Sequence, residues 1–252
     1  MNAAVTIWSR QMTKFFRSPM ELGGTLLQPI LWMVLFSAAM RGMVGELTGP
    51  GGYIPFVTPG IAALTALAGA VTGGAALLDE RLRGIVKEYA VAPIPRPAIL
   101  VGNIAASTTK ALIQSALILV VGLLMGARLQ GSPLGWFGAL ALLTLFGLGA
   151  AGIAAAAASK SPSTGAYHGV IFLLNLPVLF ASNGLVPLGL LPTWLAWIAR
   201  LNPVTYLVAA FRQLVFGVPA DVSLPLATAV VAGFCLLGLW AGAAGFRSAL
   251  QE

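Results

Sequence analysis

Charged residues are scarce in this sequence. Only 8% of its 252 residues are Asp, Glu, Lys or Arg, whereas 58% are hydrophobic and the mean hydropathy is +0.92. An ordinary soluble domain is about 25% charged. The composition therefore excludes a soluble fold and indicates an integral membrane protein. We expect a single membrane domain over residues 1–252, since a chain of this length has room for about five to seven spans with short loops.

Residues that carry out catalysis or bind metals are also rare. Cys235 is the only cysteine, so an intrachain disulfide and a CxxC metal site are excluded. The single histidine, His168, excludes HExxH, and the phosphate-binding pattern GxxxxGK[ST] is absent. An intramembrane serine protease would need serine and histidine facing each other within spans, but Ser161, Ser163 and His168 fall in a predicted connection. We expect no catalytic residue, metal or cofactor in this chain.

The excess of positive charge does not indicate a nucleic-acid partner. The formal net charge is +7, but the 14 Lys and Arg residues are dispersed between membrane-length apolar runs instead of forming a stripe. Anionic lipid on the cytoplasmic side of a membrane explains this excess better. We therefore expect contact with membrane lipid and no nucleic acid.

Six apolar runs predict transmembrane helices, because a span needs about 20 largely apolar residues. Residues 187–225, before the last run, hold two apolar pieces, each too short to span, which are broken at Arg200, Asn202 and Pro203. We expect them to form half-helices that dip into one membrane face. The predicted fold class is thus all-α, with six spans and a re-entrant hairpin, and the spans cover residues 22–40, 56–78, 99–126, 134–158, 170–186 and 226–246.

The first twenty residues predict an amphipathic helix that lies in the membrane interface. Polar residues, including Arg10 and Lys14, fill one side of this helix. The apolar residues recur at helical spacing on the other side, at Val5, Trp8, Met12 and Phe15. A helix with a basic and an apolar face binds in the plane of the membrane surface.

The distribution of Lys and Arg predicts the orientation. With the N-terminus inside, nine of these residues lie in cytoplasmic pieces and four lie outside. Because cytoplasmic loops carry the excess of Lys and Arg, both termini are expected in the cytoplasm of a multi-pass protein of the cell membrane. The half-helices then face outside, and the connection after the second span faces the cytoplasm.

That connection, residues 79–97, is the densest charge cluster in the chain, DERLRGIVKEYAVAPIPRP. Leu82, Ile85 and Val86 are interleaved with the charges, which predicts a short amphipathic helix able to dock into a partner's groove. The alternative is a solvated loop whose basic charge only holds it in the cytoplasm.

Lys110 is the only Lys or Arg well inside a predicted span. An intramembrane charge is by default a candidate functional residue. Its long side chain could instead reach the cytoplasmic head groups. No Asp or Glu falls inside a predicted span, which argues against a proton-coupled carrier and for an external energy source.

The order of these features resembles the type-2 ATP-binding cassette exporter permeases, and most of all their drug-resistance and nodulation-factor branch. The resemblance lies in the spacing of acidic, Gly, Pro and Arg residues in the charged connection, and in the segment LPTWLAWIARLNPVTYLVAAFRQLVFG before the last span. A departure is Asn103, where many members carry lysine. The resemblance implies that the charged connection couples to an ATPase through Asp79, Glu80, Arg81, Gly84, Lys87, Glu88, Pro93 and Arg96.

The resemblance further implies a half-transporter. Two copies, or one copy and a similar permease, would sit on a dimer of cytoplasmic ATPases that bind ATP and Mg. Its interfacial helix would include Trp8, Arg10, Lys14 and Phe15. An external gate would include Asn202, Pro203, Tyr206 and Arg212. A substrate path along the dimer seam would include Met33, Phe36, Asn175 and Asn183.

The expected function is export of an amphipathic or hydrophobic small molecule, such as a drug, lipid-like or glycolipid cargo, by a permease that is not itself an enzyme. A seam of methionine, aromatic and small residues suits such cargo better than ions. A competing hypothesis is a six-span scaffold that anchors a partner protein and transports nothing. A channel is disfavoured because no span carries ring-forming charges.

Overall fold

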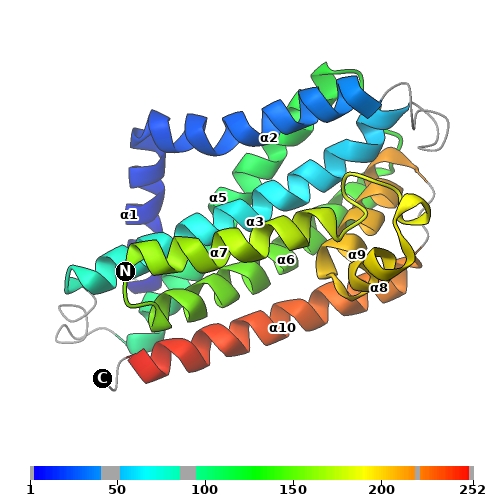
Figure 1. The fold of residues 1–252 in the computed structure, drawn as a ribbon. Coiled ribbons are helices and arrows are strands. Elements are labelled where there is room, and N and C mark those ends of the chain that lie inside the picture. The colour runs from blue at the N-terminus through cyan, green and yellow to red at the C-terminus, as the bar shows by residue number, and fades with distance from the viewer. Residues whose placement is uncertain (1–2, 41–51, 86–94, 219–221, 250–252) are drawn as a thin grey trace.

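The computed structural model describes residues 3–40, 52–85, 95–218 and 222–249, and in these ranges all regular structure is helical (Figure 1). Two short segments depart from α geometry, a 3-10 turn at Leu188–Leu190 and a π-helical turn at Arg212–Phe216. The helices are α1 (Ala3–Arg17), α2 (Pro19–Met40), α3 (Tyr53–Leu82), α5 (Arg96–Leu124), α6 (Pro133–Lys160), α7 (Thr164–Phe180), α8 (Thr193–Leu201), α9 (Pro203–Phe211) and α10 (Leu224–Ala249).

Five helices in the described ranges are long and apolar enough to cross a membrane, namely α2, α3, α5, α6 and α10. The predicted all-helical membrane fold is confirmed to that extent. The predicted fifth span, residues 170–186, corresponds to α7, which begins and ends about six residues earlier. Ser163 caps its N-terminus by accepting a hydrogen bond from the Ala166 amide, and the chain turns at Ser182, Asn183 and Gly184. His168 therefore lies exposed within α7 and not in the connection predicted for it.

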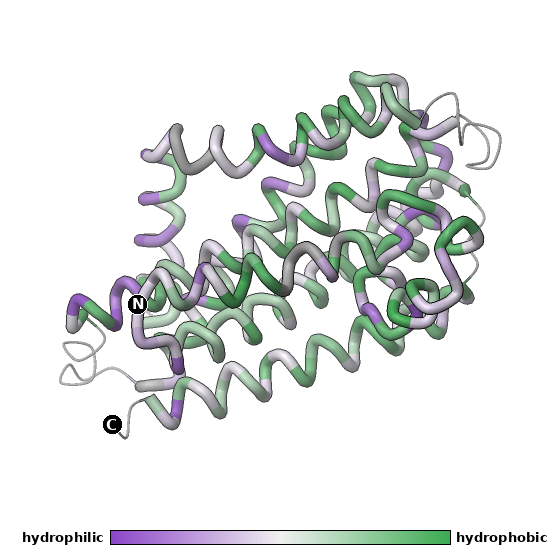
Figure 2. The backbone as a smooth tube through the Cα atoms, in the orientation of Figure 1, coloured by the Kyte–Doolittle hydropathy of each residue, from purple (hydrophilic) through white to green (hydrophobic). Residues whose placement is uncertain are grey.

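The long helices run side by side, and α1 lies across one end of the bundle (Figure 1). Both ends of the described chain are found there, and we call it the α1 end. Helices α8 and α9 lie at the opposite end, which we call the α9 end. Apolar residues follow the middle of the long helices, whereas hydrophilic residues gather mainly on α1 and toward the two ends (Figure 2). This distribution is the one that a bilayer around the bundle requires.

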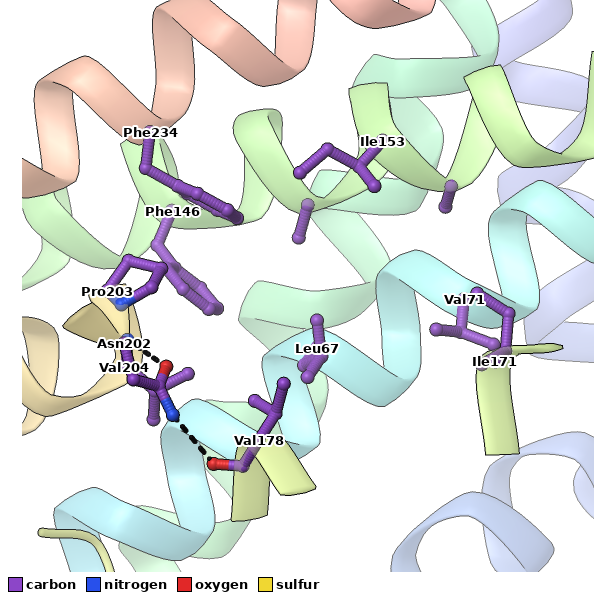
Figure 3. A pocket seen from close by; sticks show the side chains of 12 residues that line it. Leu67, Val71, Phe146, Ile153, Ile171, Val178, Asn202, Pro203, Val204 and Phe234 are labelled. Atoms are coloured by element: carbon purple, nitrogen blue, oxygen red, sulfur yellow. Dashed lines mark hydrogen bonds between the residues drawn. The ribbon is translucent and has the colours of Figure 1, made fainter. Parts of the chain in front are cut away.

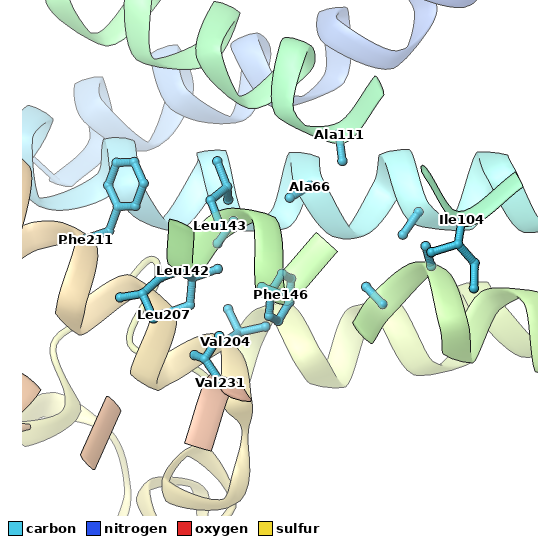
Figure 4. Close-up of a cluster of buried hydrophobic side chains, with 14 of the residues drawn as sticks. Ala66, Ile104, Ala111, Leu142, Leu143, Phe146, Val204, Leu207, Phe211 and Val231 are labelled. Carbon is cyan, nitrogen blue, oxygen red and sulfur yellow. The ribbon is translucent and has the colours of Figure 1, made fainter. Parts of the chain in front are cut away.

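The apolar core lies where α3, α6, α9 and α10 meet (Figure 4). Phe146 of α6 is at its centre, and its ring stacks on Phe234 of α10 with centroids 5.1 Å apart. Helix α9 contributes Val204, Leu207 and Phe211, all nearly completely buried. The segment expected to face outside is therefore packed into the core along most of α9.

Small residues allow α6 and α10 to pack backbone against backbone. A Cβ atom on Gly238 would collide with the carbonyl group of Gly149, and one on Gly152 would collide with the backbone at Gly238. Contacts of this kind drive helix association in lipid, where no hydrophobic effect acts between helices. The predicted fourth span, residues 134–158, is rich in the Gly and Ala residues that such packing requires.

Replacing Gly238 by alanine is expected to destabilise the protein by about 1–3 kcal/mol, the usual cost of overpacking a tight contact. Gly233 lies on the same helix, and a Cβ atom added to it would have no neighbour within 4 Å. Gly233→Ala is therefore the matched control and should be neutral or slightly stabilising. Thermal unfolding of both variants in detergent measures the difference. Equal melting temperatures for the two would contradict the packing argument.

Candidate functional site

Helix α1 lies against α5 through one apolar face. Ile7, Met12 and Phe15 are buried, and Phe15 is completely inaccessible. The predicted apolar side was therefore only partly right, because Val5 is half exposed and Trp8 is 36% exposed. Trp8 still contacts α5, where its indole Nε1 donates to Thr109 Oγ1 at 3.1 Å. The predicted helix is present at Ala3–Arg17, and the buried part of its apolar face packs on protein.

Glu80 joins the end of α3 to α1. Its Oε1 accepts from Arg10 Nη2 at 2.5 Å and from Gln11 Nε2 at 3.0 Å. Only 14% of the Glu80 side chain is exposed, against 45% for Arg10. Hydrogen bonds between charged groups are roughly twice as strong as neutral ones. We call Glu80, Arg10 and Gln11 the α1 clamp, since they fix α1 to the last turn of α3.

Lys110 lies beneath the same helix. It is 3% exposed, and its Nζ lies 5.2 Å from the centroid of the Phe15 ring, within the range of a cation–π contact. Helix α1 therefore covers Lys110, for which the sequence had left open a functional role or contact with the head groups. Lys110 and Lys14 are also close enough to Glu80 to interact with its carboxylate electrostatically. Positive charge thus surrounds the Glu80 carboxylate from α1 and from α5.

The last turn of α3 also contacts α6 and carries an ion pair of its own. Arg81 donates to the carbonyl oxygens of Ala158, at 2.9 Å, and Ser159 in the last turn of α6, where a cation is favourable. Asp79 and Arg83 form an exposed i,i+4 ion pair, with 2.9 Å between Arg83 Nε and Asp79 Oδ1. This single turn therefore contacts α1 and α6 with adjacent side chains.

The second span was predicted to end at Leu78, and this boundary is wrong. Helix α3 continues through Asp79 and Glu80 to Leu82, because polar residues with good helix propensity can extend a helix beyond its apolar run. Beyond the C-cap residue Arg83 the chain turns at Gly84, whose φ of +80° is the left-handed conformation that glycine adopts readily. The amide of Gly84 donates to the Arg81 carbonyl at 3.0 Å.

Several predicted coupling residues cannot be placed with the rest. Lys87, Glu88 and Pro93 lie outside the described residues. Arg96 begins α5, but its side chain is not among those described. The structure places Asp79, Glu80, Arg81 and Gly84 in or next to the last turn of α3, and of these Glu80 is bonded to α1 through Arg10 and Gln11. This contact between α1 and the charged connection was not predicted from residue patterns.

At the α9 end, Arg212 is buried and holds three backbone carbonyls. Its Nε donates to Phe56 O at 2.8 Å, and its Nη2 donates to Asn183 O at 2.6 Å and to Gly184 O at 3.3 Å. The guanidinium also stacks on the Phe56 ring, 3.5 Å from its centroid. Arg212 was predicted at an external gate, and the structure places its side chain in the interior, 4% exposed.

Asn202 separates α8 from α9, as the sequence predicted. Its Oδ1 accepts from the Val204 amide at 3.0 Å and caps α9, whose first residue is Pro203. Its Nδ2 donates to Val178 O at 2.9 Å and to Ala181 O at 2.6 Å, at the end of α7. Tyr206 donates to Arg200 O at 2.6 Å and so closes the turn between the two helices.

Tyr53 was missed by the sequence analysis. It begins α3, and its hydroxyl donates to Leu185 O at 2.7 Å. Tyr53, Asn202 and Arg212 therefore hold the carbonyls of one segment, residues 178–185, from three different parts of the chain. We call these three side chains the α9-end clasp. The sequence signal that could have found Tyr53 was an aromatic residue with a polar tip at the start of an apolar run.

The residues predicted for a substrate path do not gather at one place. Met33 is completely buried against α3, where Thr58 Oγ1 lies 3.9 Å from its sulfur. Phe36 stacks on Trp32 beside a shallow groove of about 440 Å³ along the outer side of α2. Asn183 is buried at the α9-end clasp, and the side chain of Asn175, on α7, is not among those described.

Comparison with known proteins identifies relatives along most of the chain. A sequence model of the family "ABC-2 type transporter" matches residues 2–216. The "Putative transport permease ycf38" of Cyanophora paradoxa is 32% identical over 79% of this chain and 69% of its own length. The "Daunorubicin resistance ABC transporter permease protein DrrB1" of Streptomyces coeruleorubidus is 27% identical over 92% and 82%, and the "Inner membrane transport permease YadH" of Escherichia coli K12 is 24% identical over 86% and 84%.

Proposed function

The chain belongs to the ABC-2 type transporter family, and from this premise we propose that it exports an amphipathic or hydrophobic small molecule from the cytoplasm. As a permease of this family it is a multi-pass membrane protein and a transport subunit, and it is not an enzyme. Relatives named for daunorubicin and doxorubicin resistance support an amphipathic cargo. We propose one membrane domain over residues 1–252.

The energy source in this proposal is a cytoplasmic dimer of separate ATPase subunits, which bind ATP and Mg. The α1 clamp is the observation that carries this step. Glu80 lies one turn before the charged residues that follow α3, and it is bonded to α1 through Arg10 and Gln11. A partner that displaces the end of α3 would therefore move α1 with it, and Arg81 would transmit the same displacement to α6. We assign coupling to this turn together with Lys87, Glu88, Pro93 and Arg96.

The α1 end is proposed to face the cytoplasm. In the described ranges, Lys and Arg residues at the α9 end are Arg128, Arg200 and Arg212, and Arg212 is buried. The opposite end carries more of them, which favours its retention in the cytoplasm. The residues at the α1 end are Arg10, Lys14, Arg17, Arg81, Arg83, Arg96, Lys160 and Arg247.

We propose that α7, the fifth long apolar helix in chain order, also crosses the membrane, which brings the number of spans to six. Its 17 residues extend roughly 25 Å at 1.5 Å per residue, against about 30 Å for the hydrocarbon core. The segment held by the α9-end clasp continues α7 toward the membrane surface. Its carbonyls are satisfied by Tyr53, Asn202 and Arg212, which makes irregular backbone tolerable at that depth. With α8 and α9 as a re-entrant pair, this region would form the external gate, to which Pro203 and Tyr206 also belong.

A second copy, or a similar permease, is proposed to pack along the outer side of α2. That side is apolar and exposed at Leu27, Leu31 and Leu35, and the shallow groove follows it. Cargo would pass between the two copies, near Phe36 and Asn175 and toward Asn183 at the α9 end. Met33 would act only by supporting α2 from behind, since α3 covers it.

The proposal predicts that the tagged chain, captured from detergent-solubilised membranes, brings down an ATPase subunit with a phosphate-binding loop in equal amount. Mass spectrometry of the captured material identifies it, and reconstituted complex should hydrolyse ATP faster when amphipathic cargo such as daunorubicin is added. A known exporter handled in parallel is the control for complex integrity. Capture of a partner without any ATPase would instead favour a scaffold that transports nothing.

A further inference from the structure

An apolar cavity lies inside the single chain, away from the exposed side of α2. Its volume is about 220 Å³, and its walls come from α3, α6, α7, α9 and α10 (Figure 3). Leu67 and Val178 form one side, and Phe146, Ile153 and Phe234 form the other. Apolar cavities of roughly 150 Å³ stay dry in proteins and bind benzene or xenon. The volume here is therefore sufficient for a ligand of several carbon atoms.

The chemistry of the walls selects an apolar occupant. Among the lining residues that the structure describes, Asn202 is the only one whose side chain carries a polar group. Its Oδ1 is bonded to the Val204 amide, and its Nδ2 is bonded to the carbonyls of Val178 and Ala181. Each hydrogen-bonding atom of that side chain is thus already engaged within the protein. A water molecule in a cavity needs two to four polar partners, so water is a poor occupant.

The position of the cavity indicates that its apolar occupant comes from the lipid bilayer. Ile153 at its rim is 42% exposed, so the cavity opens to the outside of the bundle. Helices α7 and α10, which contribute Val178 and Phe234 to its walls, carry exposed apolar side chains such as Phe172 and Leu237. The surroundings of such side chains in a membrane protein are the acyl chains of the bilayer. A lipid acyl chain, which is flexible, is thus the apolar group present at the highest concentration beside the opening of the cavity.

We propose that this cavity is a binding site for an acyl chain of a bilayer lipid. The acyl chain enters past Ile153 and packs on the stacked rings of Phe146 and Phe234. It then contacts Pro203 and Val178, which flank Asn202 at the α9-end clasp. The site goes beyond the export function, since its ligand is a structural lipid and not the cargo.

The test uses the protein reconstituted in bilayers that contain a phospholipid with a photoreactive acyl chain. Irradiation followed by peptide mass spectrometry is expected to label Phe146 and Ala150, which are 1% and 3% exposed and line the cavity. Ile153→Trp at the rim should lower this labelling roughly tenfold, as the loss of about two buried methylenes would. Leu140→Trp, at an exposed site on the same helix, is the matched control and should leave it unchanged.

Two results would overturn the proposal. One is labelling of exposed residues only, with Phe146 and Ala150 unmodified in the wild-type protein. The other is displacement of the label at these residues by micromolar daunorubicin, which would assign the cavity to cargo. If Ile153→Trp does not fold, Ala150→Leu fills the interior instead and should lower the labelling of Phe146 by the same factor. Failure of the export proposal would leave these outcomes unaffected, because neither ATP nor a partner takes part.

Discussion

Glu80→Ala is expected to abolish most cargo-stimulated ATP hydrolysis and transport while leaving membrane insertion intact. The substitution removes the carboxylate that accepts from Arg10 and from the buried Gln11, and it takes away a negative charge close to Lys110. Hydrogen bonds to charged groups contribute about 1.5–3 kcal/mol. This free energy holds α1 in its docked position, so its loss should lower the population of the docked, coupled state roughly ten- to hundredfold. Turnover of the reconstituted complex with its ATPase measures the effect.

Asp79→Ala is the matched control for this experiment. Asp79 precedes Glu80 in the same turn, but its ion pair with Arg83 is exposed, with 41% and 69% of the two side chains accessible. Such pairs contribute about 0–1 kcal/mol, so turnover should change by no more than roughly fivefold. If both substitutions lower turnover equally, the negative charge of this helical turn matters and the contact of Glu80 with α1 does not.

Arg212→Leu is expected to be the most destabilising single substitution at the α9 end. Leucine leaves the carbonyls of Phe56, Asn183 and Gly184 without their guanidinium donor in a buried position. Breaking a buried charged contact of this kind costs about 3–5 kcal/mol. The melting temperature in detergent should fall by roughly 10 °C. Arg212→Lys should recover only part of the loss, because an ammonium group cannot stack on Phe56 and donate in a fork at once.

Arg200→Leu provides the comparison for Arg212. Arg200 is exposed on α8 and lies 5.3 Å from the centroid of the Trp197 ring, a contact that contributes about 0.5–1 kcal/mol. Its loss should shift the melting temperature by only a few degrees, roughly 2–4 °C. A similar shift for the two arginines would mean that Arg212 does not hold the segment after α7.

Much of the fold was predictable because a bilayer requires long apolar runs. The runs around α2, α3, α5, α6 and α10 were each found from hydropathy, and the break at Asn202 was found from Asn and Pro in an otherwise apolar segment. The end of α3 was misplaced at Leu78 because hydropathy reports where the apolar residues end and not where the helix ends. Helix ends depend instead on propensity and on a residue such as Gly84 that can reverse the chain.

The partners of the site residues were not predictable. For Lys110 the sequence left two roles open, a functional charge or contact with the head groups, because its position within a span was known and the helix that covers it was not. Phe15 lies 95 positions earlier in the sequence, and no periodicity connects the two. The same holds for Tyr53 and Leu185, which are far apart in the chain and hydrogen-bonded in the structure. Patterns along a sequence predict elements and faces, while the contacts between elements depend on how the helices pack.

Helix α2 differs from the other long helices in how little of it the chain buries. Substitutions on its outer side, at Leu27, Leu31 or Leu35, remove few intrachain contacts, so the folding free energy should tolerate them. The tightly packed pair α6 and α10 has no such tolerance, because the glycines at its contact leave no room for a side chain. Diversification of this chain toward new cargo, by selection or by engineering, therefore disturbs the fold of the single chain least on α2.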